Sequence, residues 1–306
     1  MVESRAARTP RRFSFYRLSQ HLSQAAINVI LLAVSFFFLL PLMVVVSASF
    51  SDEQSLYKLG YSLLPQNFSL AAYKYMMLAP ERLLRAYSVT TFVTTVGTVL
   101  GLFIMSMLAY ALSRPEFKWR KPISFFVIFT MLFNGGLVPT YLLITQGLHL
   151  KDNIMVLILP YLVVPWFVFI LRSFFATLPQ EIIECARIDG ASELRIFFHL
   201  VMPLSTPALA TVGLFMILMY WNDWWLSLLY INDPNLYPLQ YLLFSIMRNA
   251  EFLTSNSATG LLMGVEMPTQ TLRMAMVVIA MGPIAVVFLA LQRYFIRGIL
   301  IGSVKG

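Results

Sequence analysis

The amino-acid sequence predicts an all-α membrane protein that crosses the bilayer six times. Composition is the first reason, because 59% of the 306 residues are hydrophobic and only 12% are charged, whereas soluble domains are about one quarter charged. The second is six apolar stretches, since a hydrocarbon core needs roughly 20 helical residues to cross it. The third is that most Lys and Arg residues fall on one side of these stretches, as in cytoplasmic loops.

The six expected spans cover residues 25–50, 86–113, 122–145, 153–171, 206–231 and 274–294. The first follows a basic start, yet its apolar region is longer than that of a signal peptide, so we expect it to remain as an anchor. The fourth is the shortest, and Arg172 at its end can extend its charged group to the interface. Six such stretches argue against the buried core helices of a soluble protein.

Basic residues orient these helices. With the N-terminus inside, 15 of the 22 Lys and Arg residues lie on the cytoplasmic side. They are Arg5, Arg8, Arg11, Arg12, Arg17, Arg114, Lys118, Arg120, Lys121, Arg172, Arg187, Arg195, Arg293, Arg297 and Lys305. Both termini are therefore expected in the cytoplasm. The net charge of +8 then reflects membrane orientation rather than nucleic-acid binding.

This topology divides the chain into three segments. Residues 1–24 form a cytoplasmic N-terminal segment, either an amphipathic helix on the inner membrane face or a disordered basic tail. Residues 25–297 form the six-span domain, whose long inner loop covers 172–203. Residues 298–306 form a cytoplasmic tail.

Composition also excludes several chemistries. A single cysteine, Cys185, permits no internal disulfide, and three scattered histidines form no metal motif. The sequence has no Gly-rich phosphate loop, no paired carboxylates and no nucleophile beside a base. We therefore predict a chain that is not an enzyme, does not hydrolyse ATP and binds no cofactor or metal itself.

The inner loop carries a charged stretch, "EIIECARIDGASELRIFFHLVMP", at 181–203. Pro179 suits the first turn of a helix because it lacks an N–H. Gly190 is expected to end that helix in a left-handed conformation, and Ser192 to cap a second helix that runs to Pro203. The small residues at the turn either enter a cleft of a partner protein or belong to a plain connection between two spans.

The spacing in this loop resembles the signature loop of ABC-importer permeases. The matching residues are Glu184, Cys185, Ala186, Gly190, Leu200, Met202 and Pro203, with cysteine and methionine in place of the usual alanine and leucine. The resemblance implies a cytoplasmic coupling helix, between spans four and five, that sits in a groove of an ATP-binding subunit. It assigns ATPase coupling to Glu184, Cys185, Ala186, Arg187, Asp189 and Gly190.

Other stretches resemble the carbohydrate-uptake, maltose-importer-like branch of this family. "YWNDWWLSLLYINDP" (220–234) is similar to its fifth span, and "LQRYFIRGILIGSVKG" (291–306) to a tail that reaches the ATPase interface. This tail would bring Gly302, Ser303 and Lys305 to the ATPase. "LFNGGLVPTYLL" (132–143) and "GLLMGVEMPTQTLRMA" (260–275) resemble importers of larger, often acidic oligo- and polysaccharides. The alginate importer is an example, and the chain resembles its second permease subunit.

The resemblance implies a non-catalytic permease subunit in a bacterial plasma (inner) membrane. Its partners would be a homologous permease subunit in a heterodimer, two ATP-binding subunits that hold ATP and Mg, and an extracytoplasmic solute-binding protein. Carbohydrate would pass by alternating access, and the outer loop 232–270 would either dock the binding protein or cap the outer mouth. The alternative is an ion-gradient-driven secondary transporter. That class needs paired intramembrane charges or an inverted repeat, whereas the sequence offers one mid-span acid, Asp223.

Candidate residues of the sugar pathway lie in the third and fifth spans. They are Asn134, Tyr141, Tyr220, Asn222, Asp223 and Trp224. An acid in a span is costly to bury, so Asp223 either serves the substrate or bonds a neighbouring helix. The tryptophans either stack on sugar rings or form an interfacial aromatic belt. The "NGG" at 134–136 either allows close helix packing or breaks the third span.

Overall fold

The computed structural model describes residues 12–255 and 269–302, and the regular elements within them are helices. The longer helices are α1 (Arg12–Ser49), α4 (Pro80–Ser113), α5 (Arg120–Leu132), α7 (Pro165–Ala176), α11 (Thr206–Trp221), α13 (Leu239–Ser255) and α15 (Thr269–Gly302). The shorter ones are α2 (Glu53–Leu59), α3 (Ala71–Met76), α6 (Leu137–Leu142), α8 (Gln180–Ile188), α9 (Glu193–Ile196), α10 (Met202–Leu204) and α12 (Trp225–Tyr230). Turns of wider or tighter helix are η1 (Leu143–Gly147), η2 (Ile154–Leu157), η3 (Leu159–Tyr161), η4 (Phe197–Val201) and η5 (Pro234–Leu236). The predicted all-helical class is confirmed for the described residues.

Three of the expected spans are continuous helices. Segments Gln24–Ser49 of α1, Pro80–Ser113 of α4 and Thr269–Ala290 of α15 are each long and apolar enough to cross a bilayer. α1 begins at Arg12, so one unbroken helix covers the end of the predicted N-terminal segment and the first span.

The other three expected spans, at 122–145, 153–171 and 206–231, are bent or broken, and the break in the third is one of the two alternatives that "NGG" offered. α5 is followed by α6 and η1 at an angle of 113°, and the η2–η3 segment by α7 at 47°. A bend of 81° separates α9–α10 from α11. With each bent pair counted as one span, the described residues contain up to six spans.

Asn134 and a glycine break the third span. The Asn134 Oδ1 accepts a hydrogen bond from Gly136 N at 2.9 Å, a local turn that competes with helix formation. Gly136 has a φ of +88°, in the left-handed region that glycine enters without strain. A Cβ placed on Gly136 would meet no atom within 4 Å, so this glycine does not permit a close helix contact within the chain. "NGG" therefore serves to break the helix here.

Asp223 lies at the break in the fifth span. α11 ends at Trp221 and α12 begins at Trp225. Asp223 therefore lies between two helices, whereas the sequence predicted that it lies inside one. Its Oδ1 accepts a hydrogen bond from Tyr161 Oη at 3.0 Å, and its Oδ2 accepts one from Leu226 N at 3.3 Å. The carboxylate thus has the structural partners that an ionisable group in a membrane requires.

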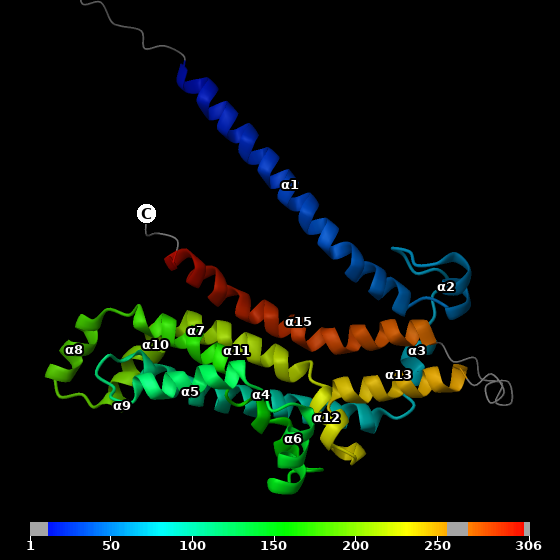
Figure 1. Ribbon diagram of the computed structural model, residues 1–306. Coiled ribbons are helices and arrows are strands. Elements are labelled where there is room, and N and C mark those ends of the chain that lie inside the picture. The colour runs from blue at the N-terminus through cyan, green and yellow to red at the C-terminus, as the bar shows by residue number, and fades with distance from the viewer. Residues whose placement is uncertain (1–11, 256–268, 303–306) are drawn as a thin grey trace, which may run out of the picture.

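The helices form an elongated bundle with two different ends (Figure 1). α4, α7 and α11 pack around a buried cluster that includes Met105, Val168 and Met216, and a second cluster joins α13 to α15 through Leu239 and Leu272. α8 and α9 lie at one end of the bundle, whereas α2 and α13 lie toward the other. α1 packs on α15 and diverges from the body toward its own first turns.

Candidate functional site at the α8–α9 loop

α8 ends in a tight glycine turn. Gly190 has a φ of +79°, which an L-residue adopts only with strain. Ala191 N donates a hydrogen bond to Ala186 O at 3.0 Å, and Gly190 N donates one to Arg187 O, also at 3.0 Å. This pair of bonds is a Schellman cap, which satisfies the last carbonyls of the helix. Gly190 therefore ends the helix in the way its sequence position predicts.

The second helix begins at a serine cap. Ser192 Oγ accepts a hydrogen bond from Arg195 N at 3.4 Å, as its position predicts. α9, η4 and α10 then follow one another without a gap up to Leu204, one residue beyond Pro203. Ile196 is buried, so this helix is held against the bundle.

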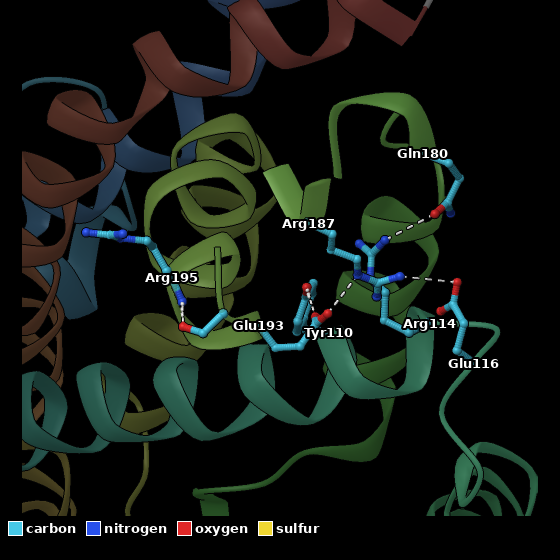
Figure 2. Close-up of polar contacts among 8 residues, drawn as sticks. Tyr110, Arg114, Glu116, Gln180, Arg187, Glu193 and Arg195 are labelled. Atoms are coloured by element: carbon cyan, nitrogen blue, oxygen red, sulfur yellow. Dashed lines mark hydrogen bonds and ion pairs between the residues drawn. The ribbon is translucent and has the colours of Figure 1, made fainter. Parts of the chain in front are cut away.

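Glu193 ties the loop to the end of α4 (Figure 2). Its Oε2 accepts a hydrogen bond from Tyr110 Oη at 2.7 Å, and its Oε1 accepts one from Arg187 Nε at 2.8 Å. Tyr110 belongs to α4, Arg187 to α8 and Glu193 to α9. One carboxylate therefore joins three helices, and we call Tyr110, Arg187 and Glu193 the loop clamp.

Two further contacts extend the loop clamp. Arg187 Nη1 lies 3.5 Å from Glu116 Oε1, in the connection that follows α4. Arg114 Nη1 donates a hydrogen bond to Gln180 Oε1 at 3.4 Å, at the start of α8. The Arg114 guanidinium also lies 4.7 Å from the centroid of the Tyr110 ring, and Arg114 is only 4% exposed. The end of α4 thus holds both helices of the loop.

The charges of the loop clamp stabilise one another. Burial raises the pKa of Glu193, but the hydrogen bonds from Tyr110 and Arg187 outweigh it, so this pKa lies below its usual value. The hydrogen bond to Glu193 in turn raises the pKa of Arg187. Both side chains are therefore charged at neutral pH.

The face of α8 that points away from the bundle is exposed and ends in an apolar tip. Glu184, Cys185 and Asp189 are exposed, and the Ile188 side chain next to the glycine turn is 84% exposed. The Arg187 guanidinium instead bonds to Glu193 and Glu116 of the same chain. Behind the loop lies a cavity of about 390 Å³, whose lining residues include Phe117 and the loop clamp.

Three of the predicted pathway residues in the third and fifth spans make contacts within the chain. Tyr220 is buried, and its Oη donates a hydrogen bond to Ile158 O at 2.9 Å. Tyr141 stacks on Tyr230 with ring centroids 5.6 Å apart. Asp223 is held as described above.

Asn222 and Trp224 differ from Tyr220 because both are exposed. Gln240 Nε2, from α13, donates a hydrogen bond to Asn222 Oδ1 at 3.3 Å. Asn134 is exposed at the break in the third span. The predicted pathway residues therefore do not form one cluster, and their substrate roles stay predictions.

Sequence reasoning did not identify the α4 side of the loop clamp. Tyr110 precedes Glu193 by 83 positions, and no local pattern connects the two. Of the predicted tail, Gly302 ends α15, while Ser303 and Lys305 lie outside the described residues, as does 256–268 of the outer loop. Across residues 12–255 and 269–302, no group of three or more His, Cys, Asp or Glu side chains is placed to hold a metal ion.

The described residues combine up to six helical spans with a charged helix–turn–helix between two of them, an architecture that suits a membrane transport subunit. Residues 97–301 match the family described as "Binding-protein-dependent transport system inner membrane component". The chain belongs to this family.

Relatives align with this chain over most of its length. It is 39% identical to the polygalacturonan/rhamnogalacturonan transport system permease protein YtcP of Bacillus subtilis (strain 168), over 87% of this chain and 92% of the relative. It is 28% identical to the arabinooligosaccharides transport system permease protein AraQ of the same organism, over 96% and 98%. A chain in the crystal structure of a bacterial ABC transporter involved in the import of the acidic polysaccharide alginate matches with a TM-score of 0.75 and 26% identity, over 95% of this chain and 100% of that chain. The predicted resemblance to sugar-transporting ABC permeases is confirmed.

Proposed function

We propose that this chain is a non-catalytic permease subunit of an ATP-driven, binding-protein-dependent importer of acidic oligo- or polysaccharides in a bacterial plasma membrane. It pairs with a homologous permease subunit and receives its substrate from an extracytoplasmic binding protein. Two ATP-binding subunits hold ATP and Mg. The substrate class is supported by relatives named for polygalacturonan and alginate, which are both polymers of uronic acids.

The α8–α9 loop is the observation that carries this proposal. Its exposed face offers Glu184, Cys185, Asp189 and the Ile188 tip to a partner, while its rear is bonded to α4 through the loop clamp. A displacement of α8 by a closing ATPase dimer would therefore be passed to α4, which is a candidate span. Coupling needs such a contiguous, hydrogen-bonded connection between the moving part and the pathway.

The arrangement of the bundle supports the proposed topology. α8 lies at one end, and the Gly302 end of α15 points the same way (Figure 1). The basic residues Arg114 and Arg172 also fall on the side that the positive-inside rule assigns to the cytoplasm. We therefore infer that the α8–α9 loop and both termini are cytoplasmic.

Gly190 allows a sharp test of docking. A Cβ on Gly190 would meet no atom within 4 Å of this chain, so a side chain there adds backbone strain but no internal clash. Gly60, the residue that follows α2, offers a control, because it also has a positive φ (+77°) and equally open surroundings, and α2 lies toward the other end of the bundle from α8 (Figure 1). Gly190→Phe and Gly60→Phe thus both impose backbone strain. The strain is larger at Gly60, because its ψ of −171° places it in a region that only glycine adopts readily, so this control is the more stringent of the two.

We expect Gly190→Phe to abolish co-purification of the ATPase subunits, or to leave ATP hydrolysis without sugar uptake. Gly60→Phe should retain both association and uptake. Both properties are measured on the complex after affinity purification and in proteoliposomes supplied with binding protein. Normal coupled uptake by the Gly190→Phe complex would refute the docking role of the loop.

A further inference from the structure

A row of aromatic rings runs along α13 and onto the break between α11 and α12. Tyr237 and Tyr241 lie with ring centroids 4.7 Å apart, and Tyr241 and Phe244 with centroids 6.4 Å apart. Phe244 stacks on Trp224 at 4.7 Å, and Trp224 meets Trp225 edge to face at 5.8 Å. These five side chains form what we call the aromatic row. Tyr241 and Phe244 are three residues apart and therefore lie on one face of α13, and Tyr237 lies just before the first residue of that helix, Leu239.

The aromatic row is accessible on one side. Trp224 is 38% exposed and Trp225 is 44% exposed, while Tyr237, Tyr241 and Phe244 are half-buried. A pocket of about 320 Å³ opens beside Trp224 and Phe244, between α13 and the start of α15. α13 and α15 lie side by side at the end of the bundle opposite α8 (Figure 1). In the proposed topology this is the outer end.

The pocket has a small number of polar side chains at its wall, as ligand sites in proteins usually do. Gln240 lines the pocket and reaches Asn222 by the hydrogen bond of 3.3 Å. Arg273, in the first turns of α15, also lines it. The Arg273 Nη2 donates a hydrogen bond to Glu251 Oε1 at 2.7 Å, whereas its Nε is buried and has no hydrogen-bond partner in the described part of the chain. The Arg273 side chain as a whole is 39% exposed, so its positive charge remains accessible to a ligand in the pocket.

We propose that the aromatic row and its pocket form a carbohydrate-binding track for an acidic pyranose chain. One face of a pyranose presents C–H groups that pack on the electron-rich face of an aromatic ring. The amides of Gln240 and Asn222 suit the sugar hydroxyls, and Arg273 suits a uronate carboxylate through charge-assisted hydrogen bonds. This inference rests on the proposed function, and it adds the place at which this subunit binds the sugar.

An interfacial lipid belt is the competing occupant. A belt places amphipathic rings at the headgroup level, and it requires neither rings stacked on one another nor an arginine that lines a pocket beside them. The aromatic row has both features, and amides flank it. These properties favour a sugar chain.

The row is tested by direct binding of trigalacturonate to the whole complex in nanodiscs without binding protein, together with uptake into proteoliposomes. Trp224→Ala and Phe244→Ala should each weaken binding about tenfold, the loss typical of an aromatic anchor cut to alanine. Trp119→Ala is the matched control, because Trp119 is an exposed tryptophan outside the row, 61% exposed at the start of α5. Unchanged binding in both row variants, or an equal loss in the control, overturns the track.

Arg273 is tested by the preference for trigalacturonate over the neutral maltotriose. Arg273→Gln should remove that preference. Glu251→Gln breaks the same ion pair but leaves the guanidinium in place, so the preference should persist or increase. An equal loss of preference in both variants assigns the effect to the ion pair and overturns the ligand contact.

Two results separate this inference from the function on which it rests. If the wild-type complex takes up trigalacturonate and the row variants take it up equally well, the track is overturned but the proposed function is not. A wild-type complex that transports none of trigalacturonate, an alginate trisaccharide or maltotriose overturns both. Brominated lipid provides a further test, because it quenches the fluorescence of tryptophans that it contacts. If this quenching is smaller in Trp224→Phe than in the wild type, the row contacts lipid and the track is overturned.

Discussion

Removing the Tyr110 hydroxyl should loosen the α8–α9 loop while leaving the bundle folded. Tyr110→Phe deletes the 2.7 Å hydrogen bond to Glu193. The ring itself keeps its contact with Phe197, with centroids 5.4 Å apart, and its place beneath the Arg114 guanidinium. The substitution therefore removes one bond of the loop clamp and little packing.

The size of the effect follows from the surroundings of that bond. A hydrogen bond to a charged group contributes about 1.5–3 kcal/mol when it is buried. The Glu193 side chain is 53% exposed, so solvent screening lowers the expected contribution to about 1 kcal/mol. A loss of about 1 kcal/mol shifts the equilibrium between the bonded and released loop by about fivefold.

The measurement is the number of ATP molecules hydrolysed per sugar transported in proteoliposomes. We expect this ratio to rise in Tyr110→Phe and in Glu193→Gln, with a non-additive effect in the double variant because the two side chains share one bond. Tyr87→Phe is the control, since Tyr87 also lies on α4 and its Oη donates a hydrogen bond to Ile279 O at 2.8 Å, away from the loop. It should leave the ratio unchanged.

Two outcomes would contradict this reasoning. If Tyr110→Phe hydrolyses and transports at the wild-type ratio, the loop clamp does not pass movement to α4. If the two single effects simply add, each side chain acts through some contact other than their shared hydrogen bond.

Three further predictions concern packing, capping and pH. Gly101→Ala should lower the free energy of unfolding by about 1–3 kcal/mol, measured by thermal denaturation of the complex, because the added Cβ would lie 2.8 Å from a backbone carbonyl oxygen. Gly282→Ala is the control and should leave it unchanged, since its Cβ would meet no atom within 4 Å. Glu53→Gln should weaken the start of α15 by about 1 kcal/mol, since this carboxylate accepts a hydrogen bond from Thr271 N at 2.8 Å, and limited proteolysis should then cut there faster. The lowered pKa of Glu193 means that its contribution is present above the usual value of 4.5 and is lost as the pH falls through the lower, folded-state value. Coupling should thus be insensitive to Glu193 ionisation between about pH 6 and 8, and added acid sensitivity below that usual value should be absent in Glu193→Gln.

Local signals made the α8–α9 loop readable from the sequence. A helix cap is a contact between neighbours in the chain, so Gly190 and Ser192 carry their turn wherever the loop is placed. The sequence offered a break at 134–136 as one of two alternatives, but it did not predict the break at Asp223. Hydropathy registers the length of an apolar stretch, but it does not register whether a partner such as Tyr161 is present to stabilise a break at Asp223.

The sequence by itself determined the membrane class, the apolar stretches, the helix–turn–helix and the resemblance to ABC-importer permeases. All of these depend on composition or on residues close in the chain. The tertiary structure alone decided that Tyr161 bonds to Asp223 at the break in the fifth span, that Glu193 joins α4 to the loop and that Phe244 of α13 stacks on Trp224. These features depend on residues far apart in the chain, whose meeting is set by the packing of whole helices and not by any local pattern.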